Sequence, residues 1–194
     1  MEKLMVLDGN SIVNRAFYGI RLLTNNEGLY TNAVYGFLNI LLKYIEEEKP
    51  DGLLVAFDLH APTFRHLKYD KYKANRKGMP DELRQQMPLL KEVLSAMNIT
   101  MISKEGFEAD DLIGTVSNIC GEQGVKCVIL TGDKDDLQLA SHTTTIKLVT
   151  TKGGTTSTVD YDYDSFLKEY EITPTQFIDV KGLMGDSSDN IPGV

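Results

Sequence analysis

The sequence predicts an α/β protein with a mostly parallel central sheet and helices on both of its faces. Up to about residue 140, short apolar runs of strand length alternate with longer segments whose apolar residues recur at helical spacing. This alternation is typical of consecutive strand–helix–strand units, because two parallel strands must be joined by a crossover, which is usually a helix. The chain has 194 residues, of which 42% are hydrophobic, and is therefore large enough to bury one substantial core.

The N-terminal quarter provides the first strand and two helices. Residues 4–7 are all apolar, and the small polar side chains of residues 8–11 favour a helix start directly after them. That helix runs through residues 12–17, and a polar loop follows. Residues 33–48 then place their large apolar side chains on one side of a second helix, which the Lys-Pro-Asp-Gly sequence at 49–52 ends.

The rest of the chain continues the pattern. Apolar runs and helical periodicity predict, in order, a strand over 53–57, a helix over 81–97, a strand over 99–102, a helix from 108–111 to about 120, and a strand over 127–130. Segments 145–150 and 155–159 predict a β-hairpin around Lys152-Gly153-Gly154. Two shorter helices follow, over 163–170 and from 173 through 183.

Composition excludes several classes of protein. No run of 18 apolar residues occurs, so we expect no membrane-spanning segment and no membrane partner. Charge interrupts the N-terminus too early for a signal peptide. The two cysteines, Cys120 and Cys127, are too few for a disulfide framework and lie in no metal-ligand spacing. These features favour a reduced, cytoplasmic protein.

Acidic residues follow three of the predicted strands and begin one of the predicted helices. The carboxyl ends of parallel strands meet at one edge of a sheet, where ligands bind in this class of fold. We therefore expect these acids to gather there, together with two from the C-terminal tail. The nine residues are Asp8, Asp58, Glu108, Asp110, Asp111, Asp133, Asp135, Asp186 and Asp189. Each one taken alone is also explained as an ordinary helix cap or as a charge near the positive end of a helix.

A cluster of nine acids needs positive charge, because like charges held close together raise one another's pKa. Hard divalent cations such as Mg²⁺ take oxygen ligands and supply that charge. Two such ions about 4 Å apart stabilise the attacking and the leaving oxygen of a phosphoryl displacement. The acids therefore predict metal-assisted chemistry on a phosphate ester.

A basic segment suggests a polyanionic partner, although the net charge of the chain is −8. From Arg65 to Lys77, six of thirteen residues are Lys or Arg, against one acid, Asp70. On a helix, four of these residues would share one face on which rings stack on bases and cations neutralise phosphates: Tyr69, Tyr72, Lys73 and Arg76. An ordinary solvated helix is the alternative. Because Gly78-Met79-Pro80 ends the segment, it also fits a mobile arch over the acidic edge.

Six short motifs occur in the order and at the spacings of a known family. They are Leu-Asp-Gly-Asn-Ser at 7–11, Val-Ala-Phe-Asp at 55–58, Tyr-Lys-x-x-Arg at 72–76, Glu-Ala-Asp-Asp at 108–111, Thr-Gly-Asp-Lys-Asp at 131–135 and Gly-Asp-Ser-Ser-Asp-Asn-Ile-Pro-Gly-Val at 185–194. Over essentially the whole chain they resemble the 5′-nuclease (flap endonuclease) domains of bacterial DNA polymerase I. The resemblance implies a PIN-like or resolvase-like 5′-nuclease fold. It also implies a catalytic domain at 1–160 with an arch at about 63–80, and the first part of a helix-three-turn-helix duplex-binding region at 161–194.

The resemblance further implies roles for single residues. Around a first metal ion it places Asp8, Asp58, Glu108 and Asp110, around a second Asp133, Asp135 and Asp186, and in the surrounding shell Asp111 and Asp189. It implies that Lys73 and Arg76 contact the scissile phosphate, that Tyr72 stacks on a base, and that Arg15 and Arg65 meet DNA. The expected catalytic residues are thus Asp110, Lys73 and Arg76. The expected cofactor is Mg²⁺, with two or more ions per site and Mn²⁺ able to substitute.

The expected function is that of a structure-specific, metal-dependent 5′-nuclease in primer removal, DNA replication and repair. Its expected partners are DNA with a 5′ flap, a nick or a 5′ end, and RNA-primed DNA, and we expect a monomeric domain of a larger polymerase chain. Two alternatives stay open. The sequence ends inside the expected duplex-binding motif, so the first is a DNA-binding fragment with impaired or no catalysis. The second is a small-molecule phosphatase with Asp8 as nucleophile, although Asn10 stands where that chemistry usually places another acid.

Overall fold

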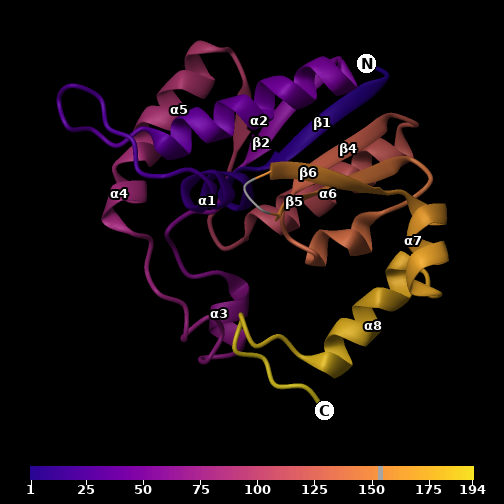
Figure 1. Cartoon of the computed structure of the whole chain (residues 1–194). Helices are drawn as coiled ribbons and strands as arrows, with labels where there is room; N and C mark the ends of the chain where they lie inside the picture. Colours follow the sequence, from indigo (N-terminus) through magenta and orange to yellow (C-terminus); the bar gives the residue numbers. More distant parts are fainter. Residues whose placement is uncertain (153–154) are drawn as a thin grey trace.

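The computed structural model describes residues 1–152 and 155–194 and shows strands and helices in alternation (Figure 1). In order they are β1 (Lys3–Asp8), α1 (Gly9–Gly19), α2 (Asn32–Glu48), β2 (Gly52–Ala56), α3 (Phe64–Lys68), α4 (Asp81–Arg84), α5 (Gln86–Ala96), β3 (Thr100–Ile102), α6 (Ala109–Glu122), β4 (Lys126–Thr131), the 3₁₀ helix η1 (Asp135–Leu139), β5 (Thr144–Lys152), β6 (Thr155–Tyr161), α7 (Tyr163–Tyr170) and α8 (Pro174–Met184). Gly153 and Gly154, predicted at the hairpin turn, lie outside the described residues. None of the helices described is both long and apolar enough to cross a membrane.

Six strands form one sheet in the order β3-β2-β1-β4-β5-β6. The first five are parallel, and β6 pairs antiparallel with β5 as the second strand of the predicted hairpin. The predicted fold class, an α/β protein with a mostly parallel sheet, is therefore confirmed. Because β1 pairs with both β2 and β4, the carboxyl ends of these three strands lie side by side.

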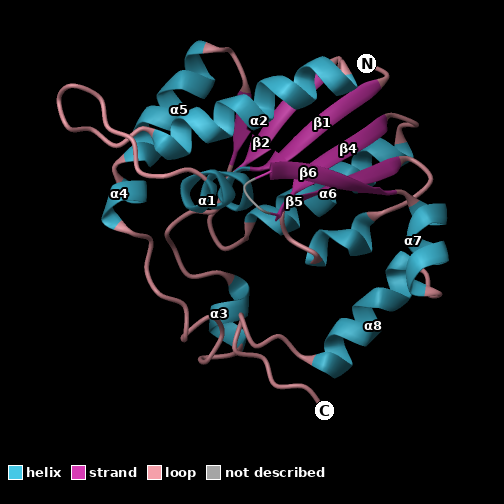
Figure 2. Cartoon of the chain, in the orientation of Figure 1, coloured by secondary structure: helices cyan, strands magenta, loops and turns pink. Residues whose placement is uncertain are grey.

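Helices cover both faces of the sheet (Figure 2). In β1, Met5 and Leu7 pack with the apolar residues of α1, α2 and α5, whereas Val6 belongs to the core formed with α6, α7 and η1. All three side chains are fully buried. Residues 4–7 are continuously apolar, with no polar residue in alternation, because neither face of this strand meets water.

The start of α1 lies close against β2. A Cβ atom at Gly9 would come within 2.5 Å of Phe57 Cε1 and within 2.7 Å of the Ala56 carbonyl oxygen. Glycine is needed at this position because no side chain fits between the two elements. The close approach brings the carboxyl ends of β1 and β2, with the acids that follow them, to one place.

One predicted helix is divided. Residues 81–97 form α4 and α5, which meet at Gln85. Pro88 lacks the N–H that would bond to the Arg84 carbonyl, and its ring crowds that carbonyl, so a regular helix cannot pass through. The division places Gln86 in the core, where its side chain accepts hydrogen bonds from the N–H groups of Ala33 and Val34 at 2.8 and 3.4 Å. It thereby caps α2, whose N-cap residue makes no side-chain cap bond.

The basic segment does not form the helix considered for it. Helix α3 ends at Lys68, turns follow, and Lys73 has a φ of 55°. Its backbone is bonded instead to the C-terminal tail: Lys73 N donates to the Asp189 carbonyl at 2.9 Å, and Asn190 Nδ2 donates to the Lys71 carbonyl at 2.8 Å. In Figure 1 the yellow tail beyond α8 accordingly returns to α3. The four aromatic and basic residues therefore share no helical face.

Candidate active site

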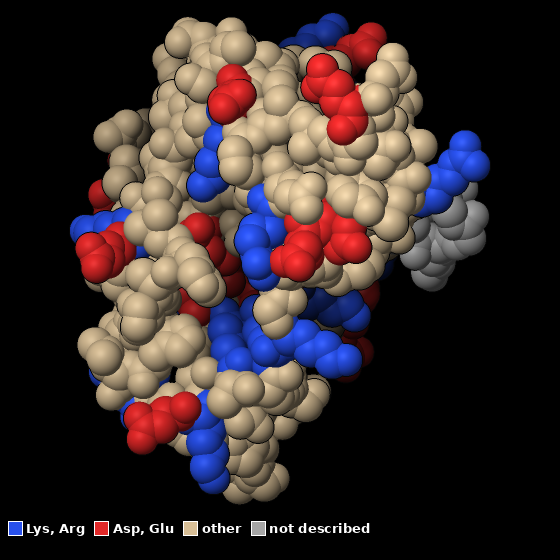
Figure 3. Space-filling view, turned by 90° about the vertical axis from the view of Figure 1, so that its left-hand side faces the viewer, with Lys and Arg blue, Asp and Glu red and all other residues tan. Residues whose placement is uncertain are grey.

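The predicted acids gather around a cavity of about 600 Å³, which we call the acidic cavity, at the carboxyl ends of β1, β2 and β4. It is lined by Asp8, Asp58, Glu108, Asp110, Asp133, Asp135, Asp186 and Asp189, and also by Arg65, Tyr72, Lys73 and Arg76. Asp111 reaches it through Arg65, to which it is bonded. Arg15 lies to one side, next to Ser11 and Gly132. On the face shown in Figure 3, basic side chains form a band beside a hollow in which acidic side chains are visible.

Three carboxylates lie closest together, those of Asp8, Asp110 and Asp136, whose oxygens come within 4.8 Å of one another. Asp8, at the end of β1, is 4% exposed. Its Oδ1 accepts a hydrogen bond from Ser11 N at 3.0 Å, and its Oδ2 accepts one from Thr131 Oγ1 at 3.1 Å. Asp8 is thus both the cap of α1 and a member of the acidic cluster, so the two explanations of this residue do not exclude each other.

Burial is the main cause that raises the pKa values of these three groups, and neighbouring carboxylates add to it. Burial raises the pKa of Asp8 to about 6. Burial, followed by the charges of Asp8, Asp133 and Asp58, raises the pKa of Asp110 to about 8. The pKa of Asp136 is raised well above its ordinary value by burial and then by the charges of Asp110 and Asp8. A bound cation would reverse all three shifts, because it favours the charged form of each carboxyl group.

Short polar contacts hold the acids that follow β2 and β4. Asp58 Oδ1 accepts a hydrogen bond from Ala109 N at 2.7 Å and so joins the end of β2 to the start of α6. After β4, Asp133 Oδ1 accepts one from Asp135 N at 2.9 Å. These bonds satisfy backbone N–H groups at the starts of α6 and η1, which have no partner within their own helix. Asp133 is therefore held within its own turn, whereas Asp58 is held by the start of α6.

Cations of the basic segment bind the acids at the start of α6. Tyr72 Oη donates to Glu108 Oε2 at 2.9 Å, and Lys73 Nζ donates to Glu108 Oε1 at 2.8 Å. The Arg65 guanidinium makes two parallel bonds of 2.8 Å to the carboxylate of Asp111, and this lowers the pKa of Asp111 although partial burial alone would raise it. Tyr72 is 6% exposed in this arrangement. Its predicted stacking on a base requires the ring to be uncovered, and that role stays a prediction.

The C-terminal tail closes the other side of the cavity. Arg76 forms an ion pair with Asp189. Lys181, in the last turn of α8, lies between two acids, with its Nζ at 2.9 Å from Asp135 Oδ1 and 3.6 Å from Asp186 Oδ2. Asp135 and Asp186, assigned to a second metal ion, therefore face a lysine, whereas Asp8 and Asp110 of the first group face each other.

Two residues of the site escaped the sequence analysis. Asp136 directly follows the predicted Asp135, and the signal for it is a third acid within the four residues 133–136. Lys181 has no comparable signal, because a single lysine near a helix end is ordinary. Their places depend on the direction in which η1 and α8 present each side chain.

The donor set fits hard divalent cations. The side chains that converge on the cavity floor offer carboxylate oxygens, which Mg²⁺ and Mn²⁺ accept. Within the described part of the chain, the buried Oδ2 of Asp136 has no hydrogen-bond partner. A buried carboxylate oxygen without a partner is costly, and a cation between the three acids would satisfy it.

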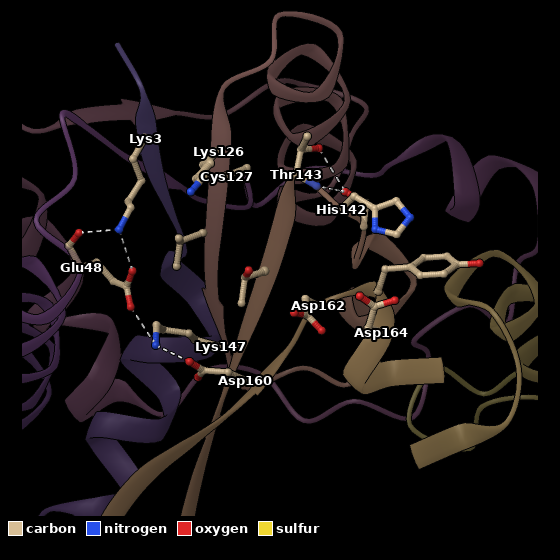
Figure 4. A pocket seen from close by; sticks show the side chains of 14 residues that line it. Lys3, Glu48, Lys126, Cys127, His142, Thr143, Lys147, Asp160, Asp162 and Asp164 are labelled. Carbon is tan, nitrogen blue, oxygen red and sulfur yellow. Dashed lines mark hydrogen bonds and ion pairs between the residues drawn. The ribbon is translucent and has the colours of Figure 1, made fainter. Parts of the chain in front are cut away.

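A second cavity, of about 400 Å³, lies at the opposite edge of the sheet, where β1 and β4 begin (Figure 4). Here Lys147 Nζ lies 2.8 Å from Glu48 Oε1 and 2.6 Å from Asp160 Oδ2, and Lys3 Nζ lies 3.3 Å from Glu48 Oε2. Lys3, Lys147, Glu48 and Asp160 thus compensate one another's charges within the protein. The contrast supports the carboxyl edge as the functional one.

Comparison with known families supports the same assignment. The family model described as "5′-3′ exonuclease, N-terminal resolvase-like domain" matches residues 3–171. The DNA polymerases I of Bacillus subtilis (strain 168) and Caldicellulosiruptor bescii are each 47% identical to this chain, over 100% and 99% of it. The matches cover 22% and 23% of the two polymerases, so this chain spans about a fifth of their length.

Solved structures share the fold. The bacteriophage T5 D15 protein, co-crystallised with metal ions, has a TM-score of 0.76 at 20% identity, and T5 5′-exonuclease with bound zinc has 0.77 at 22%. Both comparisons cover 100% of this chain and 70% of the T5 protein. The T5 D15 flap endonuclease in a pseudo-enzyme-product complex with DNA and metal ions gives 0.76 at 21%, with the same coverage. The six motifs therefore predicted the family correctly, and the chain belongs to the family of 5′-3′ exonuclease N-terminal resolvase-like domains.

Proposed function

We propose that this chain is a structure-specific, divalent-metal-dependent 5′-nuclease, which hydrolyses phosphodiester bonds at the 5′ ends and 5′ flaps of DNA. The observation that carries the proposal is the acidic cavity itself. Carboxylates from β1, β2, α6 and the loop after β4 face the cations of residues 65–76 across it. Membership of the family supports the reaction class, and the T5 flap endonuclease that shares the fold was crystallised with DNA and metal ions.

The acids would hold the metal ions, and the ions would supply an activated water and neutralise the phosphate charge. Asp8 and Asp110 face each other across the floor, and Asp58 and Asp133 border them at the ends of β2 and β4. Asp135 and Asp186 would hold a second ion in exchange for the ammonium group of Lys181. Since all the donors are oxygens, we propose Mg²⁺ as the ion, with Mn²⁺ as a substitute.

Lys73 and Arg76 would bind the scissile phosphate. Both side chains line the cavity, and both are paired with carboxylates, Lys73 with Glu108 and Arg76 with Asp189. A phosphate oxygen makes the same kind of charge-assisted hydrogen bond as a carboxylate oxygen, so DNA could take over these contacts one for one. Arg65 is tied to Asp111 by two parallel bonds and would position the start of α6 while its outer edge meets DNA.

The substrate follows from the same arrangement. We propose DNA with a 5′ flap, a nick or a 5′ end, and RNA-primed DNA, as the partners of the basic segment at residues 63–80. Residues 161–194 would begin a duplex-binding region, since the tail beyond α8 lies against that segment at Lys73 and Arg76. The relatives are about five times longer than this chain, judging from the 22% that it matches, so we propose a monomeric domain that acts within a cytoplasmic polymerase I.

A labelled 5′-flap substrate tests the proposal. The chain should cleave it with Mg²⁺ and not with EDTA, and Asp110→Asn should abolish cleavage while binding of the flap, measured by fluorescence anisotropy, largely survives. Asp164→Asn is the matched control, because Asp164 is an exposed acid in the first turn of α7. Cleavage that persists in EDTA or in Asp110→Asn would contradict a metal-dependent nuclease. Binding without cleavage by the wild-type chain at high concentration would identify a DNA-binding module instead.

A further inference from the structure

Asp136 is a buried carboxylate that none of the predicted roles uses. It is the second residue of η1, and only 2% of it is exposed. Its Oδ2 has no hydrogen-bond partner among residues 1–152 and 155–194. Most buried polar atoms in folded proteins have a partner, and an unpaired carboxylate oxygen is among the most costly exceptions. The position therefore requires an explanation that the protein atoms do not supply.

The neighbours of Asp136 are mostly acidic, and the nearby Thr131 hydroxyl already donates to Asp8 Oδ2 at 3.1 Å. The nearest ionisable groups are the carboxylates of Asp8 and Asp110, with oxygens within 4.8 Å. Both oxygens of Asp8 already accept hydrogen bonds from Ser11 and Thr131. Lys73, whose charge acts on Asp110, gives its 2.8 Å contact to Glu108. Three acids thus converge on a space in which a positive charge is missing.

Asp136 is turned inward, whereas the acid before it is turned outward. The side chain of Asp135 is 35% exposed and forms an ion pair with Lys181. Adjacent residues of a 3₁₀ helix point about 120° apart, since the helix has three residues per turn. Helix η1 therefore directs Asp135 toward Lys181 and Asp136 toward Asp8 and Asp110. The two acids therefore have different neighbours, Lys181 for Asp135 and the Asp8–Asp110 pair for Asp136.

We propose that Asp136 is a direct ligand of a divalent cation that it shares with Asp8 and Asp110, two acids that line the acidic cavity. The inference rests on the proposed function and deepens it, because it adds a ligand to the first metal site. In an octahedral Mg²⁺ site with bonds of 2.0–2.1 Å, opposite ligand atoms lie about 4.2 Å apart. The three carboxylate oxygens lie within 4.8 Å of one another, so small side-chain movements would bring them onto one ion, and waters would fill its remaining positions.

Binding of Mn²⁺ by the full 194-residue chain tests the inference without reference to activity. Free Mn²⁺ is counted by electron paramagnetic resonance during a titration, and the rise in Tm that Mn²⁺ causes is measured beside it. The variants are Asp136→Asn, which keeps the shape of the side chain, and Asp136→Leu, which fills the position with an apolar group. Asp164→Asn is the control, because Asp164 is likewise an acid in the first turn of a helix but is exposed.

Both Asp136 variants should raise the Kd for Mn²⁺ at the tightest site by about 10-fold or more, since even the loss of a residue that only orients a ligand costs 10–100-fold. Both should also reduce the rise in Tm, while their Tm in EDTA equals or exceeds that of the wild type. The control should match the wild type in every measurement. If the Kd and the rise in Tm are unchanged in both variants, the inference is overturned. If in addition both variants have a lower Tm than the wild type in EDTA, Asp136 stabilises the fold and does not bind the ion.

The same experiment separates this inference from the proposed function. If the wild type cleaves flaps and Asp110→Asn does not, while Asp136→Asn binds Mn²⁺ as the wild type does, only the ligand assignment fails. If Mn²⁺ affinity depends on Asp136 but no variant or wild-type chain cleaves DNA, the ligand stands and the nuclease proposal fails.

Discussion

Without metal, the folded protein should lose stability as the pH rises from 5 to 8. Burial raises the pKa of Asp8 from 3.8 to about 6, so between these values the folded state holds a proton that the unfolded chain has released. The stability linked to this proton is fully present below about pH 4 and is lost as the pH rises through 6. A difference of about 2 pH units, at about 1.4 kcal/mol for each, amounts to about 3 kcal/mol. That is a large share of the 5–15 kcal/mol typical of a folded domain.

Asp110 extends the loss to higher pH. Its pKa is raised to about 8 by burial and by the charges of Asp8, Asp133 and Asp58, so its proton leaves the folded state later than that of Asp8. Acids whose pKa is lowered, such as Asp111 beside Arg65 and Asp186 beside Ser188, affect stability only below about pH 4. The window from pH 5 to 8 therefore isolates the buried acids from the paired ones.

Urea denaturation in EDTA at several pH values between 5 and 8 measures the effect, with Asp8→Asn as the comparison. Asparagine keeps an oxygen that can accept the Ser11 N–H bond at the start of α1 but carries no charge. Part of the effect is already lost below pH 5, where the unfolded chain has released its proton. The free energy of unfolding of the wild type should therefore fall by about 1.4 kcal/mol more than that of Asp8→Asn between pH 5 and 8. Saturating Mg²⁺ should remove most of the fall. A wild-type stability that stays level or rises from pH 5 to 8 in EDTA, or a variant that follows the wild type, would refute the reasoning.

Three further predictions concern the fold around the site. Gln86→Ala should lower the free energy of unfolding by about 2 kcal/mol in urea denaturation, because two N–H groups of α2 lose their buried acceptor, and exposed Gln85→Ala should not; an equal effect of both changes would contradict the capping role. Gly9→Ala should cost about 1–3 kcal/mol, since its Cβ would meet Phe57 at 2.5 Å, and Gly19→Ala, with nothing within 4 Å, serves as its control; a Tm equal to that of the control would show that the strand ends can separate. Tyr72→Phe removes the bond to Glu108 and should cost about 1–2 kcal/mol while it raises the accessibility of residues 69–76 to protease, and an unchanged digestion pattern would argue against that anchor.

Local sequence patterns predicted most of the fold and the position of the site. Apolar runs bounded by polar turns indicate strands that are buried on both faces. This pattern does not depend on how the helices pack against the sheet. Acids directly after such strands must lie at the carboxyl edge of a parallel sheet, so Asp8, Asp58 and Asp133 could be placed together from their positions in the chain alone. The family motifs placed the arch cations at the same edge.

The errors arose where long-range contacts outweigh local preference. The segment at 69–76 has helical spacing of its aromatic and basic residues, but the tail at 187–190 binds its backbone and holds it in turns. The helix over 81–97 is interrupted because Pro88 removes a backbone bond and Gln86 is drawn into the core to cap α2. The proline was visible in the sequence, whereas the partner of the glutamine, about 50 residues away, was not.

The sequence by itself determined the class of the sheet, the edge at which the acids meet and the family, because each depends on residues close together in the chain and on the direction of parallel strands. Only the tertiary structure decided how the charges are shared. It paired Arg65 with Asp111, Lys73 with Glu108 and Lys181 with Asp135, and it left the Oδ2 of Asp136 buried with no hydrogen-bond partner among the residues described. Such pairings join residues up to 46 positions apart and depend on which way each element turns its side chains, which is fixed only when the layers pack.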